Sequence, residues 1–95
     1  MEKVMIVLNQ GALEERPYDN GSKTFKKVNV ELTDGKDSFA CEATDDLAVR
    51  IDKEKLSKGH IYFVDATLQL RTFKDQNGQE KKFNSIRLNS IRLLV

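Results

Sequence analysis

The residues of this chain that could bind a ligand are phenylalanines that alternate with basic side chains. Four of the five phenylalanines fall on the more polar side of an alternating stretch, and the set comprises Phe63 and Phe73 with Arg71, Phe83 with Arg87, and Phe25 with Lys27. Burying a large apolar side chain gains about 1.5–3 kcal/mol, so a purely structural barrel would turn such rings inward. A ring beside a cation suits an unpaired nucleotide, because a base can stack on the ring for about 1–3 kcal/mol while the cation neutralises the adjacent phosphate. The pattern fits equally well with rings that cover a helix or a subunit interface.

The basic residues are unevenly placed along the chain, although the net charge is only +1. Residues 23–33 carry three basic and one acidic side chain, and residues 58–95 carry seven basic and three acidic ones. Residues 34–57 are acidic overall. Because local fields attract phosphates, the two basic segments are the candidate phosphate-binding parts. Ordinary solvated charge remains the alternative.

Catalytic and metal-binding patterns are absent from the sequence. His60 is the only histidine and Cys41 the only cysteine, too few for a typical metal site. The adjacent carboxylates Asp45 and Asp46 suit a helix start better than an acid–base pair. All five glycines are isolated, so there is no phosphate-binding loop. We therefore expect a protein that is not an enzyme and uses no metal or cofactor.

The size and composition predict one domain spanning residues 1–95. No apolar run approaches the length of a membrane span, and the amino end is too short for a signal peptide. A single cysteine cannot form an internal disulfide. We expect a cytoplasmic protein with no membrane partner.

Strand patterns dominate the amino-terminal half. Val4–Leu8 is a continuous apolar run, which predicts a strand buried on both faces. Residues Glu14–Gly21 contain the only proline and predict a loop or turn. Thr24–Thr33 alternates, the pair Asp34-Gly35 favours a tight turn, and Ser38–Ala43 then returns as a short strand with its apolar side chains on one face.

A change to helical spacing follows the third strand. Thr44 or Asp45 can cap the start of a helix. One face of that helix would carry Leu47, Ile51 and Lys55, with Leu56 close by. Gly59 can end the helix, because glycine readily adopts the left-handed conformation found there. This predicts one helix of roughly three turns. Alternatively, residues 47–51 are extended and only residues 52–58 are helical.

Two long alternating runs complete the chain. Ile61–Phe73 places Tyr62 and every second residue through Leu70 on an apolar face. The pair Asn77-Gly78 predicts a hairpin into Lys82–Leu93. Ile91 and Leu93 are out of phase with Ile86 and Leu88, which predicts an extra, bulged residue near Asn89-Ser90.

The order of three strands, a helix and a long two-stranded hairpin is that of an OB-fold. We predict an all-β protein with a five-stranded OB-fold barrel and one helix between strands 3 and 4. An SH3-like barrel is the main rival, but it usually lacks a helix at that place.

The stretch Leu56–Gln79 resembles the bacterial single-stranded DNA-binding protein (SSB) family. It contains Leu-x-Lys-Gly at a helix end, a strand with an aromatic, an acidic residue and a leucine, then Arg71, Phe73 and an Asp-x-x-Gly-Gln turn. The residues Ser85–Leu94 are similar to the last strand of that family, less specifically. The resemblance implies an OB-fold, a homo-oligomer (dimer or tetramer) and base stacking on barrel aromatics. It places Phe73 at a hairpin stacking position, Phe63 at a strand aromatic, and Phe39 near a further stacking position.

The chain also departs from that family. It has no tryptophan, the loop after the second strand is short, and an acidic segment replaces an apolar one that includes a stacking phenylalanine. We expect no flexible tail with an acidic tip, so the resemblance implies a compact variant, of the kind that a phage, plasmid or integrative element would carry. These departures leave open an OB-fold adaptor that binds proteins in a replication or conjugation complex and has little affinity for DNA.

The sequence thus predicts non-sequence-specific binding of single-stranded DNA as a replication or recombination accessory. The predicted site residues are the rings Phe73, Phe63, Phe83, Phe25 and Phe39 and the cations Arg71, Lys74, Arg87, Lys82, Lys27 and Lys26.

Overall fold

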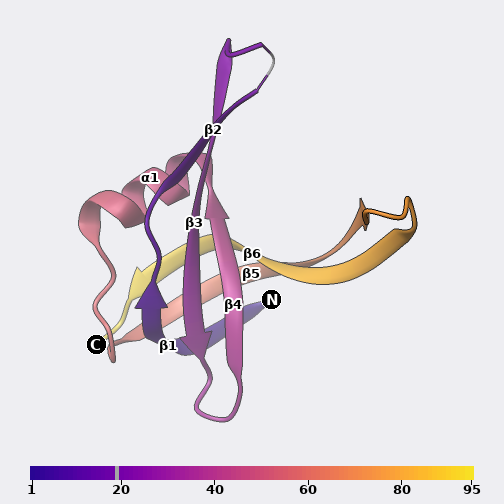
Figure 1. Cartoon of the computed structure of the whole chain (residues 1–95). Coiled ribbons are helices and arrows are strands. Elements are labelled where there is room, and N and C mark those ends of the chain that lie inside the picture. The colour runs from indigo at the N-terminus through magenta and orange to yellow at the C-terminus, as the bar shows by residue number, and fades with distance from the viewer. Residues whose placement is uncertain (19) are drawn as a thin grey trace.

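The computed structural model describes residues 1–18 and 20–95, in which six strands and one helix are present (Figure 1). The elements in chain order are β1 (Glu2–Gln10), β2 (Glu14–Tyr18), β3 (Lys23–Thr33), β4 (Ser38–Thr44), α1 (Asp45–Glu54), β5 (Ile61–Lys74) and β6 (Glu80–Leu93). This mostly β layout confirms the predicted fold class.

The strands form one sheet whose ends meet. The order is β1-β5-β6-β4-β3-β2, and an additional pairing of β1 with β3 closes five strands into a ring. β1 can close the ring because it changes partner: Glu2 to Ile6 pair with β5, and Ile6 to Gln10 pair with β3. A register shift between Val7 and Asn9 marks the change. The predicted five-stranded barrel is therefore present.

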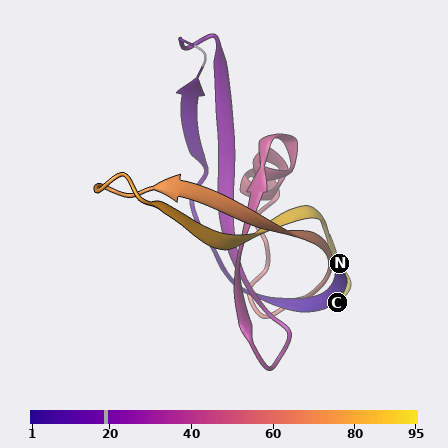
Figure 2. The ribbon, with the colours of Figure 1, turned by 90° about the vertical axis from the view of Figure 1, so that its right-hand side faces the viewer.

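Two hairpins project from the barrel in different directions (Figures 1 and 2). One is formed by β2 and the first half of β3. The other, which we call the long ribbon, is formed by residues 67–74 of β5 and 80–87 of β6, and beyond Leu68 and Ile86 its two strands pair only with each other. A two-stranded ribbon has both faces in solvent, so each of its faces is available to a ligand or partner.

The short strand β2 corrects a prediction. Residues Glu14–Gly21 were expected to form a loop, but Glu14–Tyr18 pair with Lys23–Lys27 of β3. Pro17 is tolerated because β2 is an edge strand, where one N–H needs no partner. Asp19, part of the same predicted turn, lies outside the described residues. With β2 counted, the helix follows the fourth strand rather than the third, although β2 lies outside the ring.

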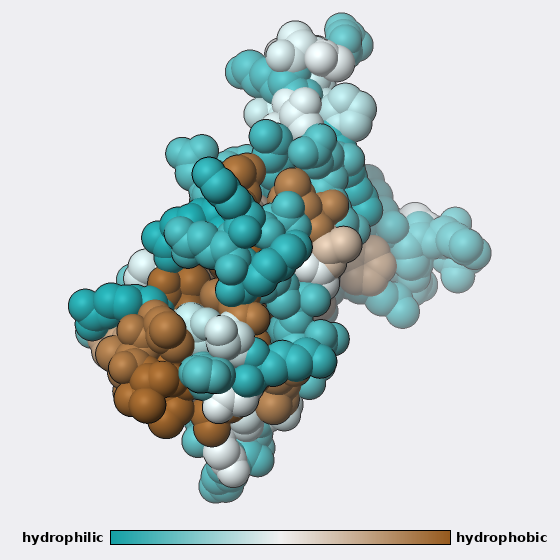
Figure 3. All heavy atoms as spheres, turned by 90° about the vertical axis from the view of Figure 1, so that its left-hand side faces the viewer, coloured by the Kyte–Doolittle hydropathy of each residue, from teal (hydrophilic) through white to brown (hydrophobic). Residues whose placement is uncertain are grey.

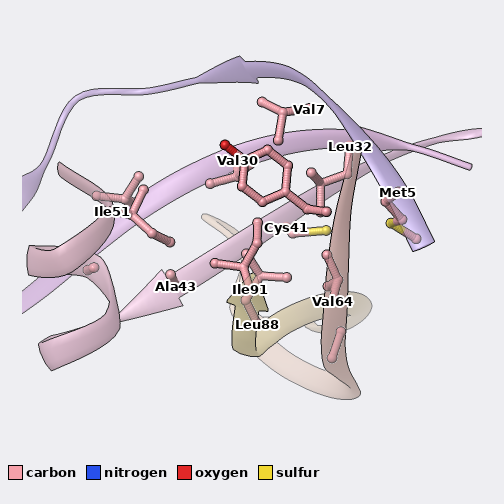
Figure 4. Close-up of a cluster of buried hydrophobic side chains, with 14 residues drawn as sticks. Met5, Val7, Val30, Leu32, Cys41, Ala43, Ile51, Val64, Leu88 and Ile91 are labelled. Atoms are coloured by element: carbon pink, nitrogen blue, oxygen red, sulfur yellow. The ribbon is translucent and has the colours of Figure 1, made fainter. Parts of the chain in front are cut away.

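The barrel core consists of fourteen buried side chains from β1, β3, β4, α1, β5 and β6 (Figure 4). The alternating residues Val28, Val30 and Leu32 are all buried, as predicted. β1 differs from its prediction, since Met5 and Val7 are buried while Val4 and Leu8 are exposed. The reason is that a barrel wall has one face toward the core and one toward solvent.

The helix α1 seals one end of this core with Ala48 and Ile51. It ends at Glu54, before the predicted stop at Gly59, because Lys55 takes a left-handed φ of 59°. The N–H of Lys55 still donates to the Ile51 carbonyl at 2.9 Å. Thr44 occupies the N-cap position, but its side chain makes no capping hydrogen bond.

The two predicted turns are longer than expected. Asp34-Gly35 belongs to a four-residue connection in which the Asp34 carboxylate accepts the N–H groups of Lys36 (2.9 Å) and Asp37 (2.8 Å). Asn77-Gly78 lies in a five-residue turn organised by Asp75, and Gly78 has a φ of 78° that favours glycine. The hairpin itself is confirmed.

The predicted bulge in β6 is confirmed. Asp65 pairs with Ser90 and Ala66 pairs with Leu88, which leaves Asn89 as the extra residue. The bulge lets both Leu88 and Ile91 reach the core. Leu68 and Leu70 share one side of β5 with Tyr62, Val64 and Ala66, as predicted. Both are nevertheless 64% exposed, because β5 has left the barrel and entered the long ribbon at these positions.

Candidate nucleic-acid interface

The candidate site is the solvent side of β3, β4, β6 and β5, which we call the outer face. Residues that pair across neighbouring strands point to the same side of a sheet. Asn29 pairs with Glu42, and Glu42 with Arg87. On the long ribbon Arg71 pairs with Phe83. The outer face therefore carries Lys27, Asn29, Glu31, Ala40, Glu42, Arg87, Ser85, Phe83, Lys81, Thr67, Gln69, Arg71 and Phe73.

Phe73 and Phe83 form the aromatic part of the outer face. Their ring centroids are 5.6 Å apart, with an edge-to-face angle of 68°. Both rings remain accessible, at 48% and 43% of their surface. Each ring stabilises the position of the other while keeping a face free, so the pair can serve as a stacking platform.

Phe25 lies on the other projecting hairpin, where it is 36% exposed. Its cross-strand partner is Arg16, so this position also combines a ring with a cation. Arg16 was not among the predicted site residues, because residues 14–21 were expected to form a loop. The alternation of Arg16 with Glu14 and Tyr18 was the signal that could have placed it on a strand.

Arg71 and Lys27 share one carboxylate at the centre of the outer face. Glu42, whose side chain is only 12% exposed, forms a short ion pair with Arg71, and its other oxygen lies 3.9 Å from the Lys27 ammonium. Arg71 also donates to Gln69 at 3.2 Å, and Lys27 lies 4.0 Å from Glu14. By contrast, Arg87 is exposed and makes no ion pair within residues 1–18 and 20–95. The predicted cations of this face are thus partly neutralised by the protein itself.

A hollow of about 240 Å³ opens in the outer face between β3, β4 and β6. Asn29, Glu42, Asn84 and Ser85 contribute polar groups to its wall. The Ser85 hydroxyl is buried and has no hydrogen-bond partner among the described residues. Ser85 was not among the predicted site residues, although it alternates with Phe83 and Arg87 on the same side of β6.

Three predicted cations lie on the opposite side of the same strands. Lys74 and Lys82 share the other face of the long ribbon with Leu70. Lys26 lies between Phe25 and Lys27 in sequence and therefore points away from both. The structure does not bring these lysines together with the rings, because a strand turns successive side chains to opposite faces.

Phe63 and Phe39 also lie apart from the outer-face cluster. Phe63 sits near the start of β5, where the Arg92 guanidinium covers its ring at 5.6 Å. A cavity of about 600 Å³ adjoins it, between the end of β6 and Arg50 and Glu54 of α1. Phe39 points inward and packs against the core, with the Lys3 ammonium 5.5 Å from its ring.

Two groups in the described part of the chain have displaced pKa values, and neither supports catalysis. Burial raises the pKa of the Cys41 thiol to about 11, so the thiolate is scarce at neutral pH. The backbone N–H of Asp37, the ammonium of Lys3 and the N–H of Lys36 lower the pKa of Asp34, which holds the β3–β4 turn. Within the described part of the chain, no group of three His, Cys, Asp or Glu side chains could hold a metal. Nor is any helix in that part long and apolar enough to cross a membrane.

The closed ring with a helix after β4 and two projecting hairpins is an OB-fold, as found in proteins that bind single-stranded DNA. No family model and no curated protein matches the sequence. Among solved structures, the chain is similar to the second OB-fold domain of replication protein A from Methanococcus maripaludis, with a TM-score of 0.62 and 15% identity over 98% of this chain and 81% of that one.

Two further solved structures share the fold. An SSB of Plasmodium falciparum in complex with single-stranded DNA has a TM-score of 0.61 and 17% identity, covering 100% of this chain and 93% of that one. A mitochondrial single-stranded DNA-binding protein of S. cerevisiae has a TM-score of 0.58 and 18% identity, covering 99% and 92%. At these identities the comparisons establish the OB-fold, and the predicted fold is confirmed.

Proposed function

We propose that this protein binds single-stranded DNA without sequence preference on its outer face and catalyses no reaction. The observation that carries the proposal is the exposed pair of Phe73 and Phe83, held on one side of a projecting ribbon with cations beside it. Stacking on a ring is open to every base, which gives affinity without sequence choice. The solved structures that share the fold, including an SSB complex with single-stranded DNA, agree with this proposal.

The path we propose for the strand runs along the outer face from the long ribbon toward the β2–β3 hairpin. Phe73 and Phe83 stack bases at one end, and Phe25 with Arg16 receives them at the other. Arg87, Arg71 and Lys27 lie between these ends and contact phosphates. The lysines on the opposite side, Lys74, Lys82 and Lys26, contact phosphates only where the DNA bends around the edge of a hairpin. Phe63 and Phe39 do not lie on this path.

A fluorescence-anisotropy titration with labelled oligo-dT tests the proposal. Binding at low salt should weaken as salt rises, with a slope of log K against log salt of about −0.7 for each phosphate neutralised. Oligo-dT should compete far better than a duplex of equal length, and oligo-rU shows whether RNA is also accepted. No binding at low salt, or equal binding of duplex, would overturn the proposal.

A second candidate is a protein-binding adaptor with little affinity for DNA. Leu68 and Leu70 on the back of the long ribbon favour it, because two adjacent leucines at 64% exposure are unusual on a free surface. This function would explain a failure to bind oligo-dT at low salt. Partner capture that depends on Leu70, together with absent DNA binding, would replace the first proposal.

We also propose a cytoplasmic homo-oligomer that serves replication or recombination, as a compact relative of the bacterial SSB family. The apolar side chains at the end of the barrel support self-association (Figure 3). Leu94 and Val95 are exposed and pair with the backbone of Ile61 at the start of β5. Leu8 is exposed as well, and it follows Val7, whose backbone pairs with Gly59 and His60. The buried free thiol of Cys41 suits a reducing compartment. We propose a phage, plasmid or integrative element as its source.

A further inference from the structure

The Glu42 carboxylate lies on the outer face between two cationic side chains, which both attract a negative charge. One carboxylate oxygen pairs with Arg71 of the long ribbon, and the other lies 3.9 Å from Lys27 of β3. These cations come from strands that are not neighbours in the sheet, since β4 and β6 lie between them. The Glu42 carboxylate is thus a negative group that joins the projecting ribbon to the barrel wall.

We infer that Lys27 and Arg71 form a phosphodiester subsite that Glu42 fills in the free protein, and that DNA must displace Glu42 to bind there. The inference rests on the proposed function and deepens it. A phosphate diester and a carboxylate present similar anionic oxygens to a guanidinium, so the two groups compete for the same donors. Glu42 thereby limits affinity, so this position sets how strongly the protein holds a single strand.

The exposures of the three side chains permit such an exchange. Arg71 is 41% exposed and Lys27 is 28% exposed, so a phosphate can approach both from solvent. Glu42 itself is mostly covered, at 12%. Because the Arg71 guanidinium is open to solvent, another anion can approach it there and compete with the Glu42 carboxylate for its N–H donors.

The test compares Glu42→Gln with Glu31→Gln in the oligo-dT titration. Glu31 is a matched control because it is exposed, points to the same side of β3 as Asn29, and makes no ion pair among the described residues. Both variants change the net charge equally. E42Q should bind oligo-dT about three- to tenfold more tightly than wild type at low salt, and E31Q about twofold or less.

The salt dependence and a double variant identify the cause. E42Q should steepen the slope of log K against log salt by about 0.7 for each cation released to a phosphate. In an Arg71→Gln background the gain from E42Q should shrink, because one of the two released cations is then missing. An equal gain with and without Arg71, or equal affinities of E42Q and E31Q, would overturn the inference.

The outcomes separate this inference from the proposed function. If wild type binds oligo-dT and E42Q behaves as E31Q does, only the inference fails. If neither wild type nor E42Q binds at low salt, the proposed function fails first and the inference with it. Circular dichroism checks folding, and Glu42→Asp serves if E42Q does not fold, since the shorter side chain keeps the charge but weakens both contacts. A gain in affinity with E42D supports the inference, and no gain overturns it.

Discussion

At the scale of single residues, position on the pleat decides which phenylalanine can meet a ligand. The outer-face rings Phe73 and Phe83 are nearly half exposed, whereas Phe39, on the core face of β4, packs inward. The difference follows from side chains alternating between the two faces of a strand. The same rule assigns the cations, because Arg71 lies beside the rings and Lys82 lies behind them.

Phe73→Ala should lower the affinity for oligo-dT about 5- to 150-fold, since base stacking on a ring is worth about 1–3 kcal/mol. Leu70→Ala is the matched control, because it removes an exposed apolar side chain from the opposite face of the same ribbon. Its affinity should stay within about twofold of wild type. Equal losses in the two variants would mean that the ribbon binds through something other than the Phe73 ring.

Cys41 should resist alkylation in the folded protein. Its raised pKa of about 11 leaves roughly one thiol in a thousand ionised at pH 8, and the side chain is buried. Iodoacetamide followed by mass spectrometry should label Cys41 only after denaturation. Rapid labelling of the native protein would show that β4 opens far more readily than its packing implies.

At the scale of elements, the helix and the turns fix the barrel that presents the outer face. Ile51 is fully buried and anchors α1 against the barrel, while Val49 on the same helix is exposed. Asp34 organises the β3–β4 turn through two backbone N–H groups and the Lys3 ammonium at 2.9 Å. The packing of Ile51 is apolar and independent of pH. The hydrogen bonds and ion pair of Asp34 depend on the charge of its carboxylate.

Ile51→Ala should lower the free energy of unfolding by about 2–5 kcal/mol, because it leaves a cavity in the core. Val49→Ala removes two methyl groups from an exposed position of the same helix, and it should change the free energy of unfolding by about 0.5 kcal/mol or less. Urea denaturation of both variants measures the difference. Similar effects of the two substitutions would contradict the packing of α1.

Asp34→Ala should lower the melting temperature at pH 7. The folded pKa of Asp34 lies below the ordinary value of 3.8, so its contribution is complete above that value and is lost as the pH falls toward the folded pKa. The difference in melting temperature between wild type and D34A should therefore shrink below about pH 4. A difference that is constant from pH 7 to pH 3 would show that the charge of Asp34 is not its cause.

At the scale of the whole molecule, the barrel has two separate surfaces. One is the polar outer face, with phenylalanines on its two projecting hairpins. The other is an exposed apolar patch at one end of the barrel. Figure 3 shows an apolar patch on this side of the molecule, and Leu94 and Val95, which pair with the Ile61 backbone, are exposed apolar residues. Separate surfaces would let copies of the chain associate while the outer faces stay open to a strand. Multi-angle light scattering should then detect a dimer or tetramer.

Leu94→Glu should dissociate the oligomer, because a charge at an apolar contact is costly to bury. Leu70→Glu, which places the same charge on the exposed long ribbon, should leave the assembly intact. Dissociation by L70E and not by L94E would move the interface to the ribbon. A monomer in wild type would remove the oligomer from the proposal.

Local patterns in the sequence predicted much of this architecture. The alternation of Val28, Val30 and Leu32 and the phase change around Asn89 are set by neighbouring residues, and both predictions are confirmed. The features that the sequence did not predict depend on tertiary structure. Leu68 and Leu70 have the pattern of core residues, and only the departure of β5 from the barrel exposes them. The pairing of Glu42 with Arg71 joins residues 29 positions apart, which no local pattern reveals.

Chemical-shift mapping of the isotope-labelled protein with oligo-dT shows most directly whether the outer face binds DNA, because it reports which face of the sheet contacts the DNA strand. The largest changes should fall on Phe73, Phe83, Arg71 and Arg87, with smaller ones on Phe25 and Arg16 of the β2–β3 hairpin. Leu70 and Lys82, on the back of the same ribbon, should change little. Shifts concentrated on that back face, or around Phe63 and Arg92, would contradict the account.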